Sequence, residues 1–228
     1  TFMNTKVEVY SYEELCFYIY NNTVLISKSA LSDKLFDWIR DELDMPGLAA
    51  KLVAMSNKTS FAQDLLVEIL NAGDYYEPEE IKTYVEAWQK YRRLTASQRK
   101  KLKADGYLGY RRYIKAASIY DDIIANQEDI TDKEFLGNVY HNRGVAAANN
   151  LDKEDAKAYF LKAYELNHNE ESLRGYFIVF AAGNDSTSIR QEMRKYDLDD
   201  DNYENLMLEI GDSNEDVREM TIFSMLQR

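Results

Sequence analysis

Small residues recur at helical spacing in one stretch of the chain, from Gly137 to Glu170. The first half contains three consecutive alanines, and the second places Ala156, Phe160 and Ala163 on one helical face, since they are four and three residues apart. Small residues allow two helix backbones to approach closely. Asn and Asp residues between the halves favour a turn, and Asp152 is placed to cap the second helix. The stretch therefore predicts two short antiparallel helices in contact.

The composition extends a helical prediction to the whole chain. Only nine glycines and two prolines occur among 228 residues, and strong helix formers fill most segments. We therefore expect an all-α fold with one substantial core or two small ones. Within it, residues 61–72 are predicted to form a helix that ends at Gly73 in the left-handed conformation.

The stretch from Gly137 to Glu170 resembles one whole tetratricopeptide (TPR) repeat, whose period is 34 residues. The large aromatic, glycine, small and second aromatic positions of that pattern match Tyr140, Gly144, Ala156, Phe160 and Ala163. Two positions depart from it: Arg143 stands where leucine is usual, and His168 stands where proline usually ends the repeat.

A second, partial repeat spans Ser97 to Ile130, and a third begins after Glu170. The second places Ala104, Ala116, Tyr120 and Ile123 at pattern positions, whereas the second half of the third departs at Arg190 and Arg194. The resemblance implies a right-handed stack of antiparallel helical hairpins, a TPR-like α-solenoid, over residues 95–228. Residues 1–94 would form an N-terminal helical part, and residues 216–228 a final amphipathic helix closing the stack.

TPR proteins are scaffolds that bind peptides on a concave face lined by the first helix of each repeat. On this sequence the corresponding positions are Lys101, Asp105, Leu108, Asn138, His141, Asn142, Val145, Asn149, Tyr176 and Val179. Lys101 and Asn142 match two positions of the family's carboxylate clamp, but Asp105, Ser172 and Tyr176 do not, which argues against a receptor for chaperone tails. An extended or helical peptide suits this mixture of amides, aromatics and aliphatics. Alternatively, the N-terminal helices cover the same face.

A basic run between residues 90 and 115 offers a second surface. Ten cations and one acid give it a charge of +9, so with a total of −12 the rest of the chain carries −21. The candidate patch consists of Arg92, Arg93, Arg99, Lys100, Lys103, Arg111 and Arg112, interleaved with tyrosines. Such a mixture can bind nucleic acid or phosphate ligands. The favoured interpretation is that these side chains face solvent or the acidic flanks of neighbouring helices.

Catalytic and metal-binding patterns are missing from the sequence. His141 and His168 are the only histidines, and no catalytic triad, zinc spacing or phosphate-binding glycine motif occurs. The acidic string from Asp197 to Asp201 begins like a calcium loop, but Leu208 replaces its closing glutamate. We expect a solvated loop that caps the next helix. The sequence therefore predicts a protein that is not an enzyme and needs no cofactor or metal.

Charge and apolar patterning limit the partners. A net charge of −12 argues against nucleic acid and anionic membranes, and no run approaches the roughly 20 apolar residues of a membrane helix. Cys16, the only cysteine, has apolar neighbours and is expected to be buried, which with the lack of a signal-peptide pattern predicts a cytoplasmic protein. Residues 10–22 resemble the start of uncharacterised helical proteins of low-GC bacteria. Self-association through end helices such as TIFSMLQR is a further alternative.

Overall fold

The protein is all-α. The computed structural model describes residues 1–58, 61–128 and 130–211. Over these residues the chain forms twelve α-helices and two short 3-10 helices, with no β-strand beyond an isolated bridge between Phe2 and Val7. The all-helical class expected from the sequence is confirmed. The final helix predicted for residues 216–228, which includes TIFSMLQR, lies outside the described residues.

Two compact units divide the chain, Thr1–Gly106 and Tyr107–Arg228. The division falls inside helix α6 (Ala96–Gly109). The boundary expected between residues 94 and 95 lies between α5 (Pro78–Arg93) and α6, and the division there into an N-terminal helical part and a repeat part stays a prediction.

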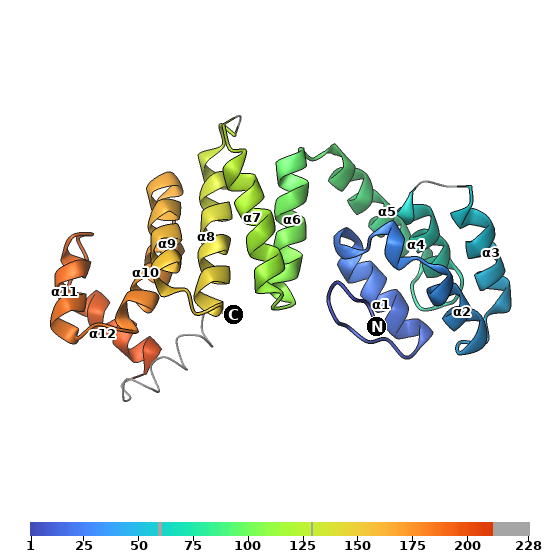
Figure 1. Ribbon diagram of the computed structural model, residues 1–228, viewed down its shortest axis with the longest axis horizontal. Helices are drawn as coiled ribbons and strands as arrows, with labels where there is room; N and C mark the ends of the chain where they lie inside the picture. Colours follow the sequence, from blue (N-terminus) through green and yellow to red (C-terminus); the bar gives the residue numbers. More distant parts are fainter. Residues whose placement is uncertain (59–60, 129, 212–228) are drawn as a thin grey trace. The chain divides into compact units, whose positions relative to one another are not determined.

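The first unit is built around α4. Before α5, it contains the helices α1 (Tyr12–Asn22), α2 (Asp33–Asp41), α3 (Pro46–Ser56) and α4 (Ala62–Asn71), with 3-10 turns at Thr23–Leu25 and Lys28–Ala30. Helix α4 contacts α1, α3 and α5, and α2 packs on α3 (Figure 1). Cys16 of α1 is fully buried, as expected, and burial raises the pKa of its thiol to about 11. The fully buried large side chains of this core are Leu15, Ile19, Phe36, Ile39, Leu52, Leu65, Leu66, Ile69 and Leu70.

The left-handed conformation predicted for Gly73 is wrong. Helix α4 has Ala72 as its C-cap with a φ of −79°, and among the described glycines only Gly211 has a positive φ. Glycine at this position instead leaves room for the Tyr12 ring, because a Cβ on residue 73 would lie 2.6 Å from Cε1 of Tyr12. The Tyr12 hydroxyl donates to the carbonyl of Ile69 at 2.6 Å, which ties α1 to the end of α4.

The second unit is a series of helices in which each packs on the next. After the end of α6 it contains α7 (Tyr113–Ala125), α8 (Lys133–Asn149), α9 (Lys153–Asn167), α10 (Glu170–Ala181), α11 (Ser186–Arg194) and α12 (Asp200–Ile210). Helices α8 and α9 make the most extensive contact, α7 packs on α8, and α10 contacts both α8 and α9 (Figure 1). The predicted cap of α9 is confirmed, since the Asp152 side chain accepts from the amide of Asp155.

Phe160 of α9 lies where three helices meet. Its side chain is fully buried, and two glycines from neighbouring helices leave room for its ring. A Cβ on Gly144 of α8 or on Gly175 of α10 would lie 2.9 Å from the ring. Ala156 and Ala163, four residues before and three after Phe160, are also fully buried. The small residues that the sequence placed on one face of α9 therefore do form its contact face.

His168, where the TPR pattern has proline, is the left-handed C-cap of α9. Its φ is 52° and its ψ is 30°, a conformation that proline cannot adopt because its ring fixes φ near −65°. The backbone amide of His168 donates to the carbonyl of Tyr164 at 2.8 Å, which closes the helix end. The departure from the pattern thus follows from the way in which α9 ends.

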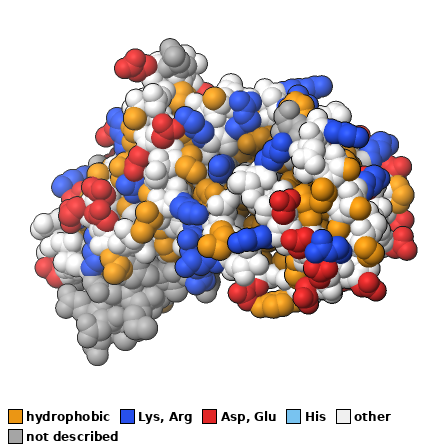
Figure 2. Space-filling model, turned by 45° about the vertical axis from the view of Figure 1, so that its right-hand side comes forward, with side chains coloured by type: hydrophobic (Ala, Val, Ile, Leu, Met, Phe, Trp, Pro, Cys, Tyr) orange, Lys and Arg blue, Asp and Glu red, His pale blue; other side chains and the backbone are white. Residues whose placement is uncertain are grey.

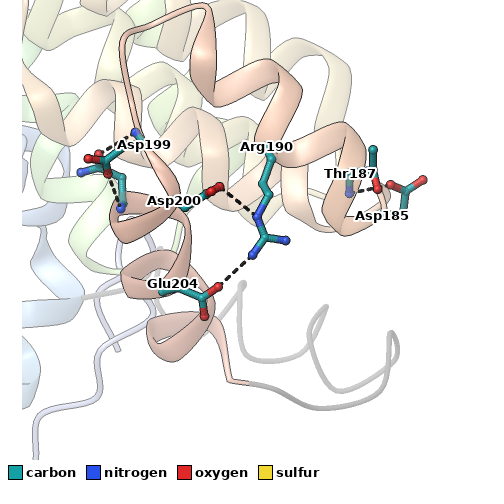
Figure 3. A network of polar contacts seen from close by, with 7 residues as sticks. Asp185, Thr187, Arg190, Asp199, Asp200 and Glu204 are labelled. Carbon is teal, nitrogen blue, oxygen red and sulfur yellow. Dashed lines mark hydrogen bonds and ion pairs between the residues drawn. The ribbon is translucent and has the colours of Figure 1, made fainter.

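Arg190 joins α11 to α12, as Figure 3 shows. Its Nε and Nη2 atoms lie 3.1 Å from Asp200 Oδ1 and 2.8 Å from Glu204 Oε1, and the guanidinium lies 3.6 Å from the centre of the Tyr203 ring. Asp199 caps α12 by accepting from the amide of Asn202, as expected for this acidic loop. Arg190 departs from the TPR pattern, and in the structure its side chain links α11 to α12.

Replacing Gly175 by alanine should lower the melting temperature. The added methyl would lie 2.9 Å from the buried Phe160 ring, and such over-packing costs about 1–3 kcal/mol. Gly183→Ala is the matched control, because a Cβ at Gly183 meets nothing within 4 Å. Thermal unfolding followed by circular dichroism measures both variants. Equal melting temperatures for the two variants would show that Gly175 does not limit the packing of Phe160.

Candidate interaction surface

Helix α8 carries a partly exposed stripe of three asparagines, one histidine and one valine. Asn138, His141, Asn142, Val145 and Asn149 are spaced three, one, three and four residues apart, so they lie within one narrow sector of the helix. All five are partly exposed, whereas the opposite side of α8 is buried against neighbouring helices. The structure therefore brings together the five residues of this helix that the sequence assigned to a partner-binding face. We call these residues the α8 stripe.

The N-terminal half of the α8 stripe is fixed by hydrogen bonds to the next helices. The Asn167 amide of α9 donates to Asn138 Oδ1 at 3.3 Å, and His141 Nδ1 lies 3.0 Å from the hydroxyl of Ser172 on α10. Ser172 is fully buried, so this contact satisfies a polar group that would otherwise be costly to bury. His141 therefore has a structural role in joining α8 to α10.

Tyr176 of α10 points toward α11. Its side chain is 5 % exposed, and its hydroxyl donates to Glu192 Oε1 at 3.0 Å. Burial, followed by the hydrogen bond to Glu192, raises the pKa of Tyr176. The rings of Phe177, Phe180 and Tyr196 surround it. The Tyr176 side chain therefore takes part in internal packing, and a role in partner binding stays a prediction.

Lys101 and Asp105 belong to the first unit and pair with each other. Lys101 Nζ lies 2.8 Å from Asp105 Oδ2 within α6, and both side chains are less than one third exposed. Leu108, near the end of the same helix, is partly buried and belongs to the second unit. The ion pair neutralises the two charges that the sequence placed at the start of the binding face.

Several cations of the basic run make contacts within the protein. Arg99 Nη1 donates to the carbonyl of Leu94 at 2.6 Å, which caps the end of α5. The Arg92 guanidinium lies 5.5 Å from the centre of the Phe61 ring, and Lys115 Nζ lies 5.4 Å from that of Tyr107. Arg93, Lys100 and Arg111 are exposed, and Lys103 and Arg112 are partly buried. On the face drawn in Figure 2, Lys and Arg side chains form separate groups among hydrophobic and acidic ones.

A cavity between α7 and α8 was not anticipated from the sequence. It has a volume of about 340 Å³, and Arg143 lies at its wall. Arg143 Nε donates to Asp121 Oδ1 at 2.7 Å, and the guanidinium lies 4.6 Å from the centre of the Tyr159 ring. Arg143 occupies the position where the TPR pattern has leucine, and this departure was the only feature of the sequence that pointed to the cavity. Its partner, 22 residues earlier, could not be identified from spacing.

The described residues contain neither a cluster of metal ligands nor a helix that could span a membrane. No group of three or more His, Cys, Asp or Glu side chains among residues 1–58, 61–128 and 130–211 is arranged to hold a metal ion. Asp199, part of the calcium-like string, serves as the cap of α12. None of the helices in this part of the chain is both long enough and apolar enough to cross a membrane.

Comparison of the chain with protein-family models, curated proteins and solved structures gives no significant match. The TPR resemblance therefore depends on the residues that carry it, among them Gly144, Ala156, Phe160 and Ala163.

The Glu192 carboxylate should contribute to the acid dependence of stability. Lys195, whose Nζ lies 2.6 Å from Glu192 Oε2, and then the Tyr176 hydroxyl lower the pKa of Glu192 from 4.5. Because the folded pKa is the lower one, these contacts stabilise the fold above about pH 4.5, and the contribution is lost as the pH falls through the folded pKa. Urea unfolding from pH 7 to pH 3 should therefore show a weaker acid dependence in Glu192→Gln than in wild type. A control variant of an exposed carboxylate, Glu128→Gln, should follow wild type, and identical profiles for all three proteins would contradict the assignment.

Proposed function

We propose that the protein is a non-catalytic scaffold that binds a peptide or protein partner through the concave face of a TPR-like, right-handed stack of helical hairpins. The sequential packing of α7, α8, α9 and α10 supports this proposal, because hairpin repeats contact their neighbours in the same order. The burial of Ala116, Tyr120, Ala156, Phe160 and Ala163 supports it further, since these residues match the pattern of the repeat. We place the protein in the cytoplasm, with its only cysteine reduced and buried.

The α8 stripe is the observation that carries the proposal. Asn142, Val145 and Asn149 form its C-terminal half, where amides and one aliphatic side chain are partly exposed without any charge. Asn149 Nδ2 donates to the carbonyl of Val145 at 2.9 Å, and its Oδ1 is buried. The amide of this half that suits the main chain of an extended peptide is therefore Asn142, since an amide both donates and accepts hydrogen bonds. The desolvation cost of such contacts is lower than for charged groups. This surface therefore suits a peptide partner better than a small charged substrate.

The internal contacts of the basic run favour the scaffold over nucleic-acid or phosphate binding. Arg99 caps a helix, and Arg92 and Lys115 lie over aromatic rings. Phosphate binding would have to displace these contacts or use the remaining cations, and its affinity would fall steeply with salt. Self-association through residues 221–228 remains an alternative that solution mass would reveal.

Affinity capture from a lysate of the native host tests the proposal. The double variant Asn142→Ala, Val145→Ser should lose a partner that wild type retains, because it removes an amide and an apolar contact from the α8 stripe. Gln191→Ala, which removes an exposed amide from α11, is the matched control and should retain the partner. Retention of the same partners by all three proteins, with unchanged melting temperatures, would show that the α8 stripe is not the binding face.

A further inference from the structure

The cavity between α7 and α8 has the features of a docking site for a side chain. Its walls include Ile114, Ala117 and Asp121 of α7 and Arg143 and Ala146 of α8, with Asp152 at the start of α9. None of the residues of the α8 stripe lines this cavity, and Arg143, which directly follows Asn142, lies about 100° further around α8. We call this cavity the α7–α8 pocket. Its volume of about 340 Å³ is large enough for a large aliphatic side chain.

One exposed apolar side chain lines the pocket, and another belongs to the turn that contributes two of its lining residues. Ile114, which lines it, is 75 % exposed, and Leu151, which lies between the lining residues Asn150 and Asp152, is 69 % exposed. Leu151 has a φ of 64°, a left-handed conformation that costs roughly 1–3 kcal/mol for a residue other than glycine. The Leu151 amide donates to the carbonyl of Ala148 at 3.1 Å, so this conformation closes the end of α8 while the side chain stays exposed. Burial against a partner would give both side chains a favourable environment.

Among the charged side chains of the pocket, the carboxylates are more exposed to solvent than the arginine. The Arg143 side chain is 14 % exposed and stays inside, paired through Nε with Asp121, whose side chain is 46 % exposed. Asp152 is also exposed and uses Oδ1 to cap α9. The lining of the pocket therefore offers a partner the carboxylates of Asp121 and Asp152 and the exposed aliphatic side chain of Ile114. Such a surface is complementary to a segment that carries both an apolar side chain and a cation.

We propose that the α7–α8 pocket binds a segment of a partner protein that presents one aliphatic side chain and, one helical turn away, a lysine or arginine. The aliphatic side chain enters the pocket beside Ile114 and Leu151, and the cation pairs with Asp121 and Asp152. This inference rests on the proposed function as a protein-binding scaffold, but it uses a surface separate from the α8 stripe. The net charge of −12 favours the approach of such a basic segment.

Selection from a phage-displayed library of random 16-residue peptides, with the full chain as bait, tests the proposal. Clones that bind wild type are tested again on Ile114→Ser, on Asp121→Asn with Asp152→Asn, on Asn142→Ala, and on Leu208→Ser. The asparagines keep hydrogen-bond acceptors for Arg143 and for the cap of α9, while they remove both charges. Leu208 is 79 % exposed on α12 and serves as the matched control.

We expect a group of clones that bind wild type and Leu208→Ser alike and bind Ile114→Ser at least tenfold more weakly, because burial of one large aliphatic side chain changes affinity by about that factor. These clones should share an aliphatic residue three or four positions from a lysine or arginine, and the double asparagine variant should weaken them too. The proposal is overturned if no clone depends on Ile114, or if the dependent clones carry acidic residues instead. Clones lost only by Asn142→Ala would leave the proposed function standing without the pocket, whereas a selection that yields no clone would count against both.

Discussion

The Phe160 ring, held between Gly144 and Gly175, is the contact on which the second unit depends. A side chain on either glycine would occupy space that the ring now fills, so α8, α9 and α10 come close only because both positions lack a Cβ. The close approach brings His141 within hydrogen-bond distance of the buried Ser172 hydroxyl. It thereby fixes the orientation of α8, with the α8 stripe partly exposed. The position of the proposed binding face is thus a consequence of core packing.

The parts of the fold that follow from local sequence could be predicted. Composition identified the all-α class, and helical periodicity and a capping residue identified the helix that begins after Asp152 and its buried face, which contains Phe160. Gly73 shows where such reasoning ends. A glycine after a helix suggests a left-handed cap, but its actual requirement is room for Tyr12, which is 61 positions earlier in the chain. Only the packing of α1 on α4 reveals that constraint.

The candidate sites also differ in how far they could be predicted, because some depend on one helix and others on contacts between helices. The α8 stripe follows from the period of a single helix, so its five residues were correctly placed together. Tyr176 depends on α11, which supplies Glu192 as the acceptor for its hydroxyl. The α7–α8 pocket combines residues from three helices, and its ion pair joins Arg143 to Asp121. Sequence signalled it only through an arginine at a position where the repeat pattern has leucine.

The central claim is that one aromatic contact holds three helices together, and native-state hydrogen exchange tests it most directly. Phe160→Ala removes the ring at a cost of about 3–5 kcal/mol and leaves the neighbouring glycines without a partner. The account predicts that amides of α8, α9 and α10 lose protection together in this variant, while those of the first unit keep theirs. Loss of protection confined to α9, with α8 and α10 unchanged, would contradict it.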